Sequence, residues 1–154
     1  MLDSSQLIVI FTSMLPVSEL RGAIPVALGV YKIPVFQAYL LAVLGNVIPV
    51  VFLLWLLDPI SRFLMRHSRV LNKFFTWLFE RTRKRHRKAV QKWGSLALIL
   101  FVAIPLPMTG GWTGSIAAFV FGIPFKKALP LIFLGILIAG MIVTLISLGI
   151  IKLF

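Results

Sequence analysis

Two long stretches without a charged residue constrain this chain more than any other feature of its sequence. The first runs from Ile33 to Leu57, 25 residues, and the second from Ala128 to Ile151, 24 residues. A helix needs about 20 apolar residues to cross the roughly 30 Å hydrocarbon core of a bilayer. Hydrophobic residues make up 60% of the chain and charged residues only 13%, too few to cover a water-soluble surface. We therefore expect an all-α integral membrane protein with transmembrane helices at 33–57 and 128–151.

A third uncharged stretch, Trp93 to Phe125, has 33 residues and fits neither one membrane crossing nor two. One straight helix of that length would be about 50 Å long, whereas two crossings need roughly 40 residues and a turn. Its middle, from Pro105 to Gly114, reads PLPMTGGWTG, which does not continue a helix. The stretch predicts a re-entrant hairpin at 93–125, with half-helices at Trp93–Ile104 and about Ser115–Gly122. A single, strongly kinked transmembrane helix is the alternative.

The N-terminal part of the chain has the same pattern. Residues 4–18 carry no charge, and a cluster of helix breakers from Pro16 to Pro25 (PVSELRGAIP) separates them from a short apolar run that ends at Tyr31. This segment is too short for two crossings and too interrupted for one. It predicts another re-entrant hairpin, at 1–31.

The two halves of the chain also match each other at an offset of 90 residues. The matched positions are Ile33 and Ile123, Pro34 and Pro124, Ala38 and Ala128, Leu41 and Leu131, and Gly45 and Gly135. Each half then consists of a hairpin, an Ile-Pro pair and a spanning helix. A re-entrant hairpin returns to the side of the membrane from which it entered, and the spanning helix that follows carries the chain across. The second hairpin therefore enters from the opposite side to the first. An inverted repeat of this kind is typical of secondary transporters.

Most of the charge lies between the two halves. The chain has a formal net charge of +12, and the segment 58–92 contains eleven Lys and Arg residues against two acids. Basic loops stay in the cytoplasm, so we expect this segment there, with Lys126 and Lys127 on the same side. Its apolar residues from Ile60 to Leu78 fall on one helical stripe with basic residues opposite. This pattern predicts an amphipathic helix on anionic lipid rather than a nucleic-acid-binding surface.

The sequence offers little for catalysis or metal binding. It has no cysteine and two histidines, His67 and His86, one on the amphipathic stripe and one in the basic run. Two histidines placed so differently do not make a metal site. We expect no metal, no cofactor and no enzymatic activity.

Glu19 and Arg21 are the ionisable residues expected at membrane depth, where charged groups are costly and indicate function by default. We expect Glu19 to carry a coupling proton and Arg21 to hold an anionic group of a substrate. The second half-helix of each hairpin directs its positive N-terminus to the same region. The predicted substrate-binding residues are Arg21, Gly22, Thr109, Gly110, Gly111 and Thr113. The alternative is that Glu19 and Arg21 form a structural pair that pins the hairpin tip.

The segments Pro16–Pro25 and Pro105–Gly114 together resemble the putative small multidrug export protein family, over nearly the whole chain. That family is similar to the DedA (VTT-domain) superfamily, which has two oppositely inserted re-entrant hairpins. The resemblance implies a multi-pass transporter in the plasma membrane of a bacterium or archaeon. The second hairpin lacks the arginine-rich stretch of the DedA pattern, so lipid-phosphate transport is not carried over directly.

Three functions stay open from the sequence. The first is a proton-coupled transporter that moves a small organic or anionic solute through a site between the hairpin tips at the middle of the membrane. The second is a translocase of anionic lipid, and the third is a non-transporting protein of envelope homeostasis. With two full spans per chain, we expect a homodimer.

Overall fold

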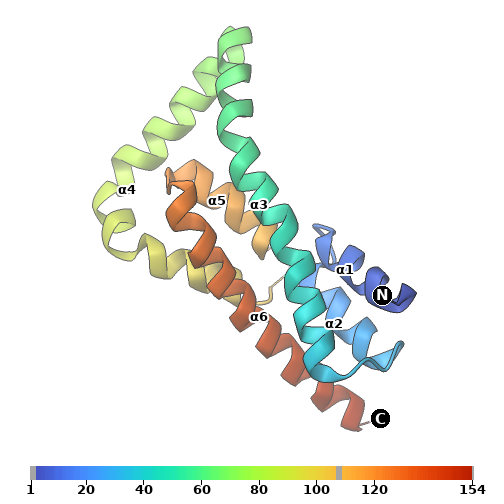
Figure 1. Cartoon of the computed structure of the whole chain (residues 1–154). Helices are drawn as coiled ribbons and strands as arrows, with labels where there is room; N and C mark the ends of the chain where they lie inside the picture. Colours follow the sequence, from blue (N-terminus) through green and yellow to red (C-terminus); the bar gives the residue numbers. More distant parts are fainter. Residues whose placement is uncertain (1–2, 107–108, 154) are drawn as a thin grey trace.

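The computed structural model describes residues 3–106 and 109–153, and the side chains of these residues except 79 and 82–92. Pro107 of the second breaker cluster, and the side chains of the basic run 83–88, lie outside that description. The described residues form helices and no strand. The helices are α1 (Ser4–Met14), α2 (Glu19–Gly29), α3 (Val35–His67), α4 (Arg69–Ala103), α5 (Gly111–Phe121) and α6 (Phe125–Leu153). Figure 1 shows their arrangement.

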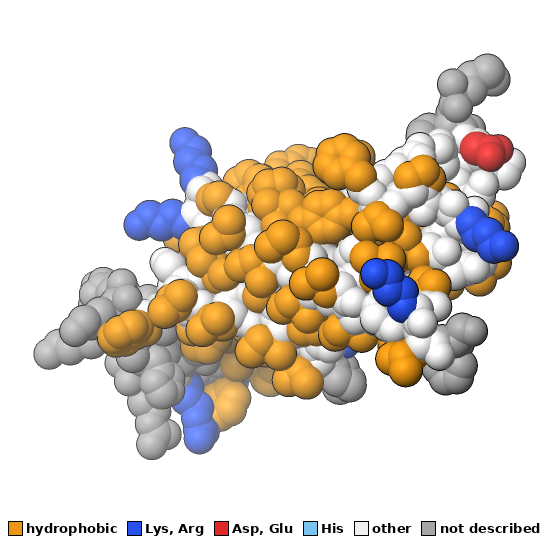
Figure 2. Space-filling view, turned by 90° about the horizontal axis from the view of Figure 1, so that it is seen from below, with side chains coloured by type: hydrophobic (Ala, Val, Ile, Leu, Met, Phe, Trp, Pro, Cys, Tyr) orange, Lys and Arg blue, Asp and Glu red, His pale blue; other side chains and the backbone are white. Residues whose placement is uncertain are grey.

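Two of these helices, α3 and α6, are long and apolar enough to cross a membrane. They contain the two uncharged runs from which transmembrane helices were expected, apart from Ile33 and Pro34, which precede α3, and they pack against each other. Exposed apolar side chains such as Phe36 and Leu145 cover their outer surfaces. Figure 2 shows one face of the molecule on which apolar side chains prevail and a few Lys and Arg side chains lie toward the ends. Such a surface suits lipid rather than water.

Both helices are longer than the runs predicted. Helix α3 continues past Leu57 to His67, and Arg62 forms an ion pair of 3.1 Å with Asp58 one turn earlier. It ends at His67. The next residue, Ser68, caps the start of α4, because its hydroxyl accepts a hydrogen bond of 3.4 Å from the Leu71 amide. The expected single amphipathic helix between the halves is therefore divided at Ser68, because this serine caps a new helix in the middle of the apolar stripe.

The bounds of the second hairpin also differ from the prediction. Its first half-helix is not separate, because α4 runs without interruption from the basic segment to Ala103. Its second half-helix begins at Gly111, four residues before the expected Ser115. The chain is non-helical between them, around Pro105 and Thr109. Gly110, Gly111 and Trp112 were all expected to belong to the non-helical tip of this hairpin. Of the three, only Gly110 does, because Gly111 and Trp112 are the first residues of α5.

The other four helices, α1, α2, α4 and α5, all pack on α3 or α6, and one helix of each half packs on the long helix of the other half. Helix α1 packs on α3 and α4 packs on α6, each on the long helix of its own half. Helix α2 also packs on α6, and α5 on α3, each on the long helix of the other half. The two chain breaks, after α1 and after α4, are thereby brought together near the crossing of α3 and α6.

Glycine allows the closest of these approaches. A Cβ added to Gly45 on α3 would lie 2.5 Å from the carbonyl oxygen of Ile10 on α1. A Cβ added to Gly135 on α6 would lie 3.0 Å from the carbonyl oxygen of Ile99 on α4. These two glycines are the pair that matched at an offset of 90 residues. Small residues of this kind let helix backbones approach each other within a membrane.

Candidate functional site

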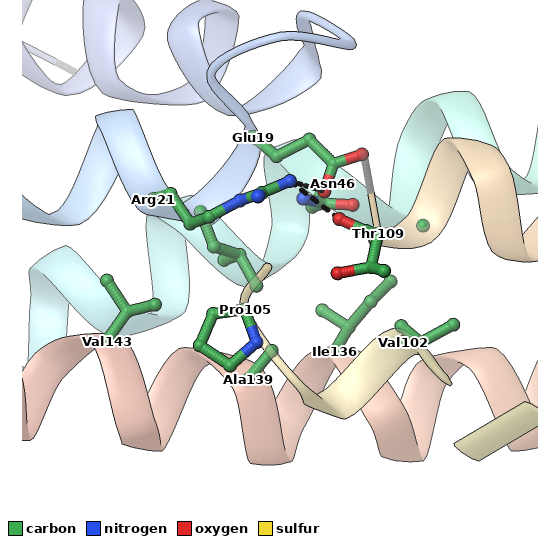
Figure 3. A pocket seen from close by; sticks show the side chains of 12 residues that line it. Glu19, Arg21, Asn46, Val102, Pro105, Thr109, Ile136, Ala139 and Val143 are labelled. Atoms are coloured by element: carbon green, nitrogen blue, oxygen red, sulfur yellow. Dashed lines mark hydrogen bonds and ion pairs between the residues drawn. The ribbon is translucent and has the colours of Figure 1, made fainter. Parts of the chain in front are cut away.

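The candidate site lies where the two chain breaks meet. The first break, 15–18, joins α1 to α2, and the hydroxyl of Ser18 donates to the Thr12 carbonyl at 2.5 Å. The second break joins α4 to α5, and the hydroxyl of Thr109 donates to the Ile104 carbonyl at 2.7 Å. Each break therefore keeps its shape through a side chain of its own. Figure 3 shows the side chains that converge between them.

Glu19 lies at the start of α5 although it belongs to α2. Its residue is 4% exposed, and its Oε1 accepts a hydrogen bond of 3.4 Å from the backbone amide of Trp112. A Cβ on Gly110 would collide with the same carboxylate, so Gly110 leaves the space that Glu19 fills. The first amides of a helix lack partners within the helix and attract negative charge. Glu19 therefore caps α5 from the opposite hairpin, which explains why α5 begins earlier than expected.

The backbone at both residues is unusual. Glu19 has a φ of 44°, a left-handed conformation that few residues other than glycine adopt, and Gly110 has a φ of 149°. Non-glycine residues in such conformations persist only where their surroundings hold them, and they are frequent at functional sites.

Arg21 contacts the backbone of the second break, the segment between α4 and α5. Its guanidinium donates to the Thr109 carbonyl at 2.6 Å and also to the Leu106 carbonyl. The distance to the Glu19 carboxylate is 4.0 Å, at the limit of an ion pair. Arg21 thus satisfies the Thr109 carbonyl, where no helix continues, and adds a charged donor to the Leu106 carbonyl, which also accepts from the Thr109 amide and hydroxyl.

A side chain of the second hairpin also makes a hydrogen bond to the first. The indole Nε1 of Trp112 on α5 donates to the carbonyl of Met14, the last residue of α1, at 3.0 Å. Each hairpin therefore supplies side chains that make hydrogen bonds to backbone groups of the other. The sequence did not single out Trp112, because the indole of an aromatic residue in an apolar stretch is usually part of the core.

Asn46 is the polar group that sequence reasoning missed. It lies on α3, is 0% exposed, and lines the same cavity. Both polar atoms of its amide lack a hydrogen-bond partner within the described part of the chain. A Cβ on Gly111 would lie 2.5 Å from its Oδ1, so the amide adjoins the first residue of α5. An uncharged amide in a run of 25 uncharged residues gives a weak signal, because Gln37 is a second amide in the same run.

The cavity between these groups is small. Its volume is about 10 Å³, space for about one water molecule. Polar groups of Glu19, Arg21, Asn46 and Thr109 form one side, and apolar residues of α4 and α6, including Ile136, Ala139 and Val143, form the other. In this conformation the cavity is too small for any solute larger than water.

The structure brings most of the predicted site residues together. Those that line the cavity are Glu19, Arg21, Thr109, Gly110 and Gly111. Gly22 and Thr113 do not line it. Gly22 packs against Ser18 of its own tip, and the Thr113 hydroxyl donates to the Gly110 carbonyl at 3.4 Å. Among the side chains that the structure describes, which do not include that of His86, no three His, Asp or Glu gather as a metal site would require.

The profile of one protein family, described as "Putative small multi-drug export protein", matches residues 19–142. The match begins at Glu19, directly after the first chain break, and includes the second break and all of α3. The chain belongs to this family. Membership of an export family and two apolar helices of spanning length make it a membrane protein, and the family is not one of enzymes. No curated protein matches the chain, and no solved structure matches it.

Proposed function

We propose that this chain is a proton-coupled secondary transporter whose substrate, a small organic or anionic solute, passes through the cavity between the two hairpin tips. The observation that carries the proposal is the convergence of an acid, a base and an unpartnered amide on one cavity at the meeting of two chain breaks. Charged groups and irregular backbone are costly within a membrane, and both are tolerated where they serve a substrate path.

The depth of the cavity supports this function. Asn46 lies next to the centre of the uncharged run 33–57, and Ala139 lies at the centre of the run 128–151. Both residues line the cavity. If each run crosses the bilayer, the cavity lies about halfway through the hydrocarbon core. Transporters with broken helices bind their substrates at this depth.

The closed state of the cavity fits a transport cycle. A substrate enters only when the two tips separate, on one side of the membrane or on the other. Among the described residues of the tips, Glu19, Arg21 and Trp112 make four hydrogen bonds that hold the tips together. At about 0.5–1.5 kcal/mol net for each bond, their loss costs a few kcal/mol. A free-energy difference of that size separates alternative conformations of one protein.

The proposed arrangement in the membrane follows from the charges. The two hairpins are re-entrant and enter from opposite sides, so that the halves form an inverted repeat. The basic segment 58–92 lies in the cytoplasm of a bacterial or archaeal cell, at the plasma membrane, and contacts anionic lipid. Two copies of the chain form the transporter. The crossed packing of α2 on α6 and of α5 on α3 supports the repeat.

Transport by the purified protein in liposomes tests the proposal. The probes are ethidium as a cationic drug, benzenesulfonate as an organic anion, and a fluorescent phosphatidate as an anionic lipid. We expect protein-dependent movement of one of them, with proton movement reported by a dye inside the vesicles. Glu19→Gln should uncouple protons, whereas Asp58→Asn, which removes an exposed acid far from the cavity, should behave as the native protein. Folded protein that moves neither a probe nor protons would point instead to the non-transporting alternative.

A further inference from the structure

The Glu19 carboxylate lies where a helix N-terminus would bind an anion. It occupies the N-terminus of α5, an 11-residue helix, and accepts the amide hydrogen of Trp112. Helix N-termini bind carboxylates, phosphates and sulfates because their amides are unpaired and their dipole is positive. The place that an anionic group of a substrate would favour is thus filled by an anionic side chain of the protein itself.

The amide of Asn46 is an independent sign of a ligand. It is completely buried, lines the cavity, and makes no hydrogen bond to the described residues. A buried amide normally has partners, since an unpaired one costs about 1–3 kcal/mol. The amide adjoins the first residue of α5 through its Oδ1 and lies beside the Glu19 carboxylate, so its NH₂ group would donate to an oxyanion bound in place of that carboxylate. The Arg21 guanidinium, within 4.0 Å of Glu19, adds a positive charge on the same side.

The charges around this position exclude a cationic ligand. Among the described residues that line the cavity, from α2 to α6, Glu19 and Arg21 are the charged groups. A cation in the place of the carboxylate would lie between the Arg21 guanidinium and the positive end of α5. A guanidinium is positively charged in proteins, so the ionised Glu19 carboxylate balances that charge. When this carboxylate leaves, its position attracts one other negative charge.

We infer that an oxyanion group and the ionised carboxylate of Glu19 compete for the same donors, so that the anion binds together with one proton. This inference rests on the transport function proposed above and specifies its substrate class. A proton from solution binds to the Glu19 carboxylate, the neutral side chain leaves the α5 N-terminus, and the oxyanion takes its place. One positive and one negative charge enter, and the net charge of the site does not change. A monovalent anion and a proton therefore cross the membrane in the same direction, without net charge movement.

Proton counting during anion binding tests the inference. Methanesulfonate is a suitable probe because it stays a monovalent anion at all working pH values. Its binding to the full chain in nanodiscs of neutral lipid is measured by calorimetry, in buffers that differ in ionisation enthalpy. We expect uptake of about one proton for each anion. Affinity should fall with rising pH and approach a tenfold loss for each pH unit, the limit for one linked proton.

Two variants separate competition from simple attraction. Glu19→Gln should bind methanesulfonate without proton uptake and with an affinity independent of pH, because its neutral side chain does not compete as an anion. Asp58→Asn is the matched control and should keep the native pH dependence. The proton count of the native protein does not depend on either variant, so the test survives if Glu19→Gln does not fold.

The source of the oxyanion is distinguished in a second arm. Phosphatidate added to the nanodiscs displaces methanesulfonate if a lipid headgroup is the physiological occupant, and does not if the ligand is a soluble anion; both results fit the inference. Anion binding without proton uptake, loss of binding in Glu19→Gln, binding of tetramethylammonium in preference, or binding of neither anion would each overturn it. If liposomes nevertheless showed proton-coupled ethidium movement, the transport function would stand and this inference alone would fail.

Discussion

Glu19 and Arg21 interact more closely with the opposite hairpin than with each other. Their charged groups are 4.0 Å apart, whereas each makes hydrogen bonds to backbone groups of the second hairpin. A transport role and a purely structural role therefore predict different behaviour when one of them is changed.

The substitutions Glu19→Gln and Arg21→Gln test these roles. Glu19→Gln keeps an oxygen that can accept the Trp112 amide, so we expect a folded protein that binds substrate but no longer moves protons. Arg21→Gln leaves the Leu106 and Thr109 carbonyls without their charged donor and should cost about 1–3 kcal/mol of stability and weaken substrate binding. The measurements are thermal unfolding and proton flux of both single variants and of the double variant. Two equally unstable single variants, rescued together in stability and in flux, would show a structural pair instead.

Gly110 provides a second prediction for single residues. It has a φ of 149°, and a Cβ there would collide with the Glu19 carboxylate. Gly110→Ala should therefore strain the tip by about 1–3 kcal/mol and displace Glu19 from α5. Gly149→Ala is the matched control, because a Cβ at that helical position meets nothing within 4 Å, and it should leave the melting temperature of the protein unchanged. Equal melting temperatures for the two variants would contradict this view of the tip.

The sequence revealed only part of this site, for physical reasons. A charged residue in an apolar segment stands out, so Glu19 and Arg21 were predicted as site residues. Asn46 carries no charge and lies in a mostly apolar run that also contains Gln37, and its importance depends on the cavity that it lines. The partners of Arg21 are backbone carbonyls of residues 85 and 88 positions later, which no local pattern indicates.

At the scale of helices, the two long apolar elements were predictable and their ends were not. Apolar length alone predicts α3 and α6. The division of the basic segment depends on the capping of α4 by Ser68, and one serine among many polar residues gives no clear signal. The early start of α5 depends on Glu19 of another helix. Both ends are decided by hydrogen bonds rather than by periodicity.

The approaches of α1 to α3 and of α4 to α6 lead to a prediction at this scale. Gly45→Ala would place a Cβ 2.5 Å from a backbone oxygen of α1, whereas Gly135→Ala would meet the Ile99 carbonyl at 3.0 Å and the Val102 side chain at 2.7 Å. Overpacking of this kind costs about 1–3 kcal/mol. We expect both variants to unfold at lower temperature than Gly149→Ala, and Gly45→Ala to be the less stable, since a backbone atom yields less than a side chain. A Gly45→Ala protein as stable as the Gly149→Ala control would argue against this packing.

For the whole molecule, the proposed topology is open to labelling, because the chain has no cysteine of its own. Single cysteines that replace Ser4 and Leu153 should react with an impermeant thiol reagent from outside the cell. Cysteines that replace Thr82 and Lys126 should react from inside, since a re-entrant second hairpin returns to the side of the basic segment. Labelling of positions 82 and 126 from opposite sides would instead indicate that the second hairpin crosses the membrane.

The central claim is that the closed cavity between the tips opens to each side of the membrane in turn. Ala139→Cys places a thiol at the lining of that cavity, and Ala27→Cys, at a core position that is 0% exposed and does not line it, is the matched control. The measurement is the rate of reaction with an impermeant thiol reagent, added from one side or the other of oriented vesicles. We predict that the thiol of the Ala139→Cys variant reacts from both sides and that of Ala27→Cys from neither. If the Ala139→Cys thiol stays unreactive from both sides, or reacts from one side alone under every proton gradient, the result would contradict alternating access through this cavity.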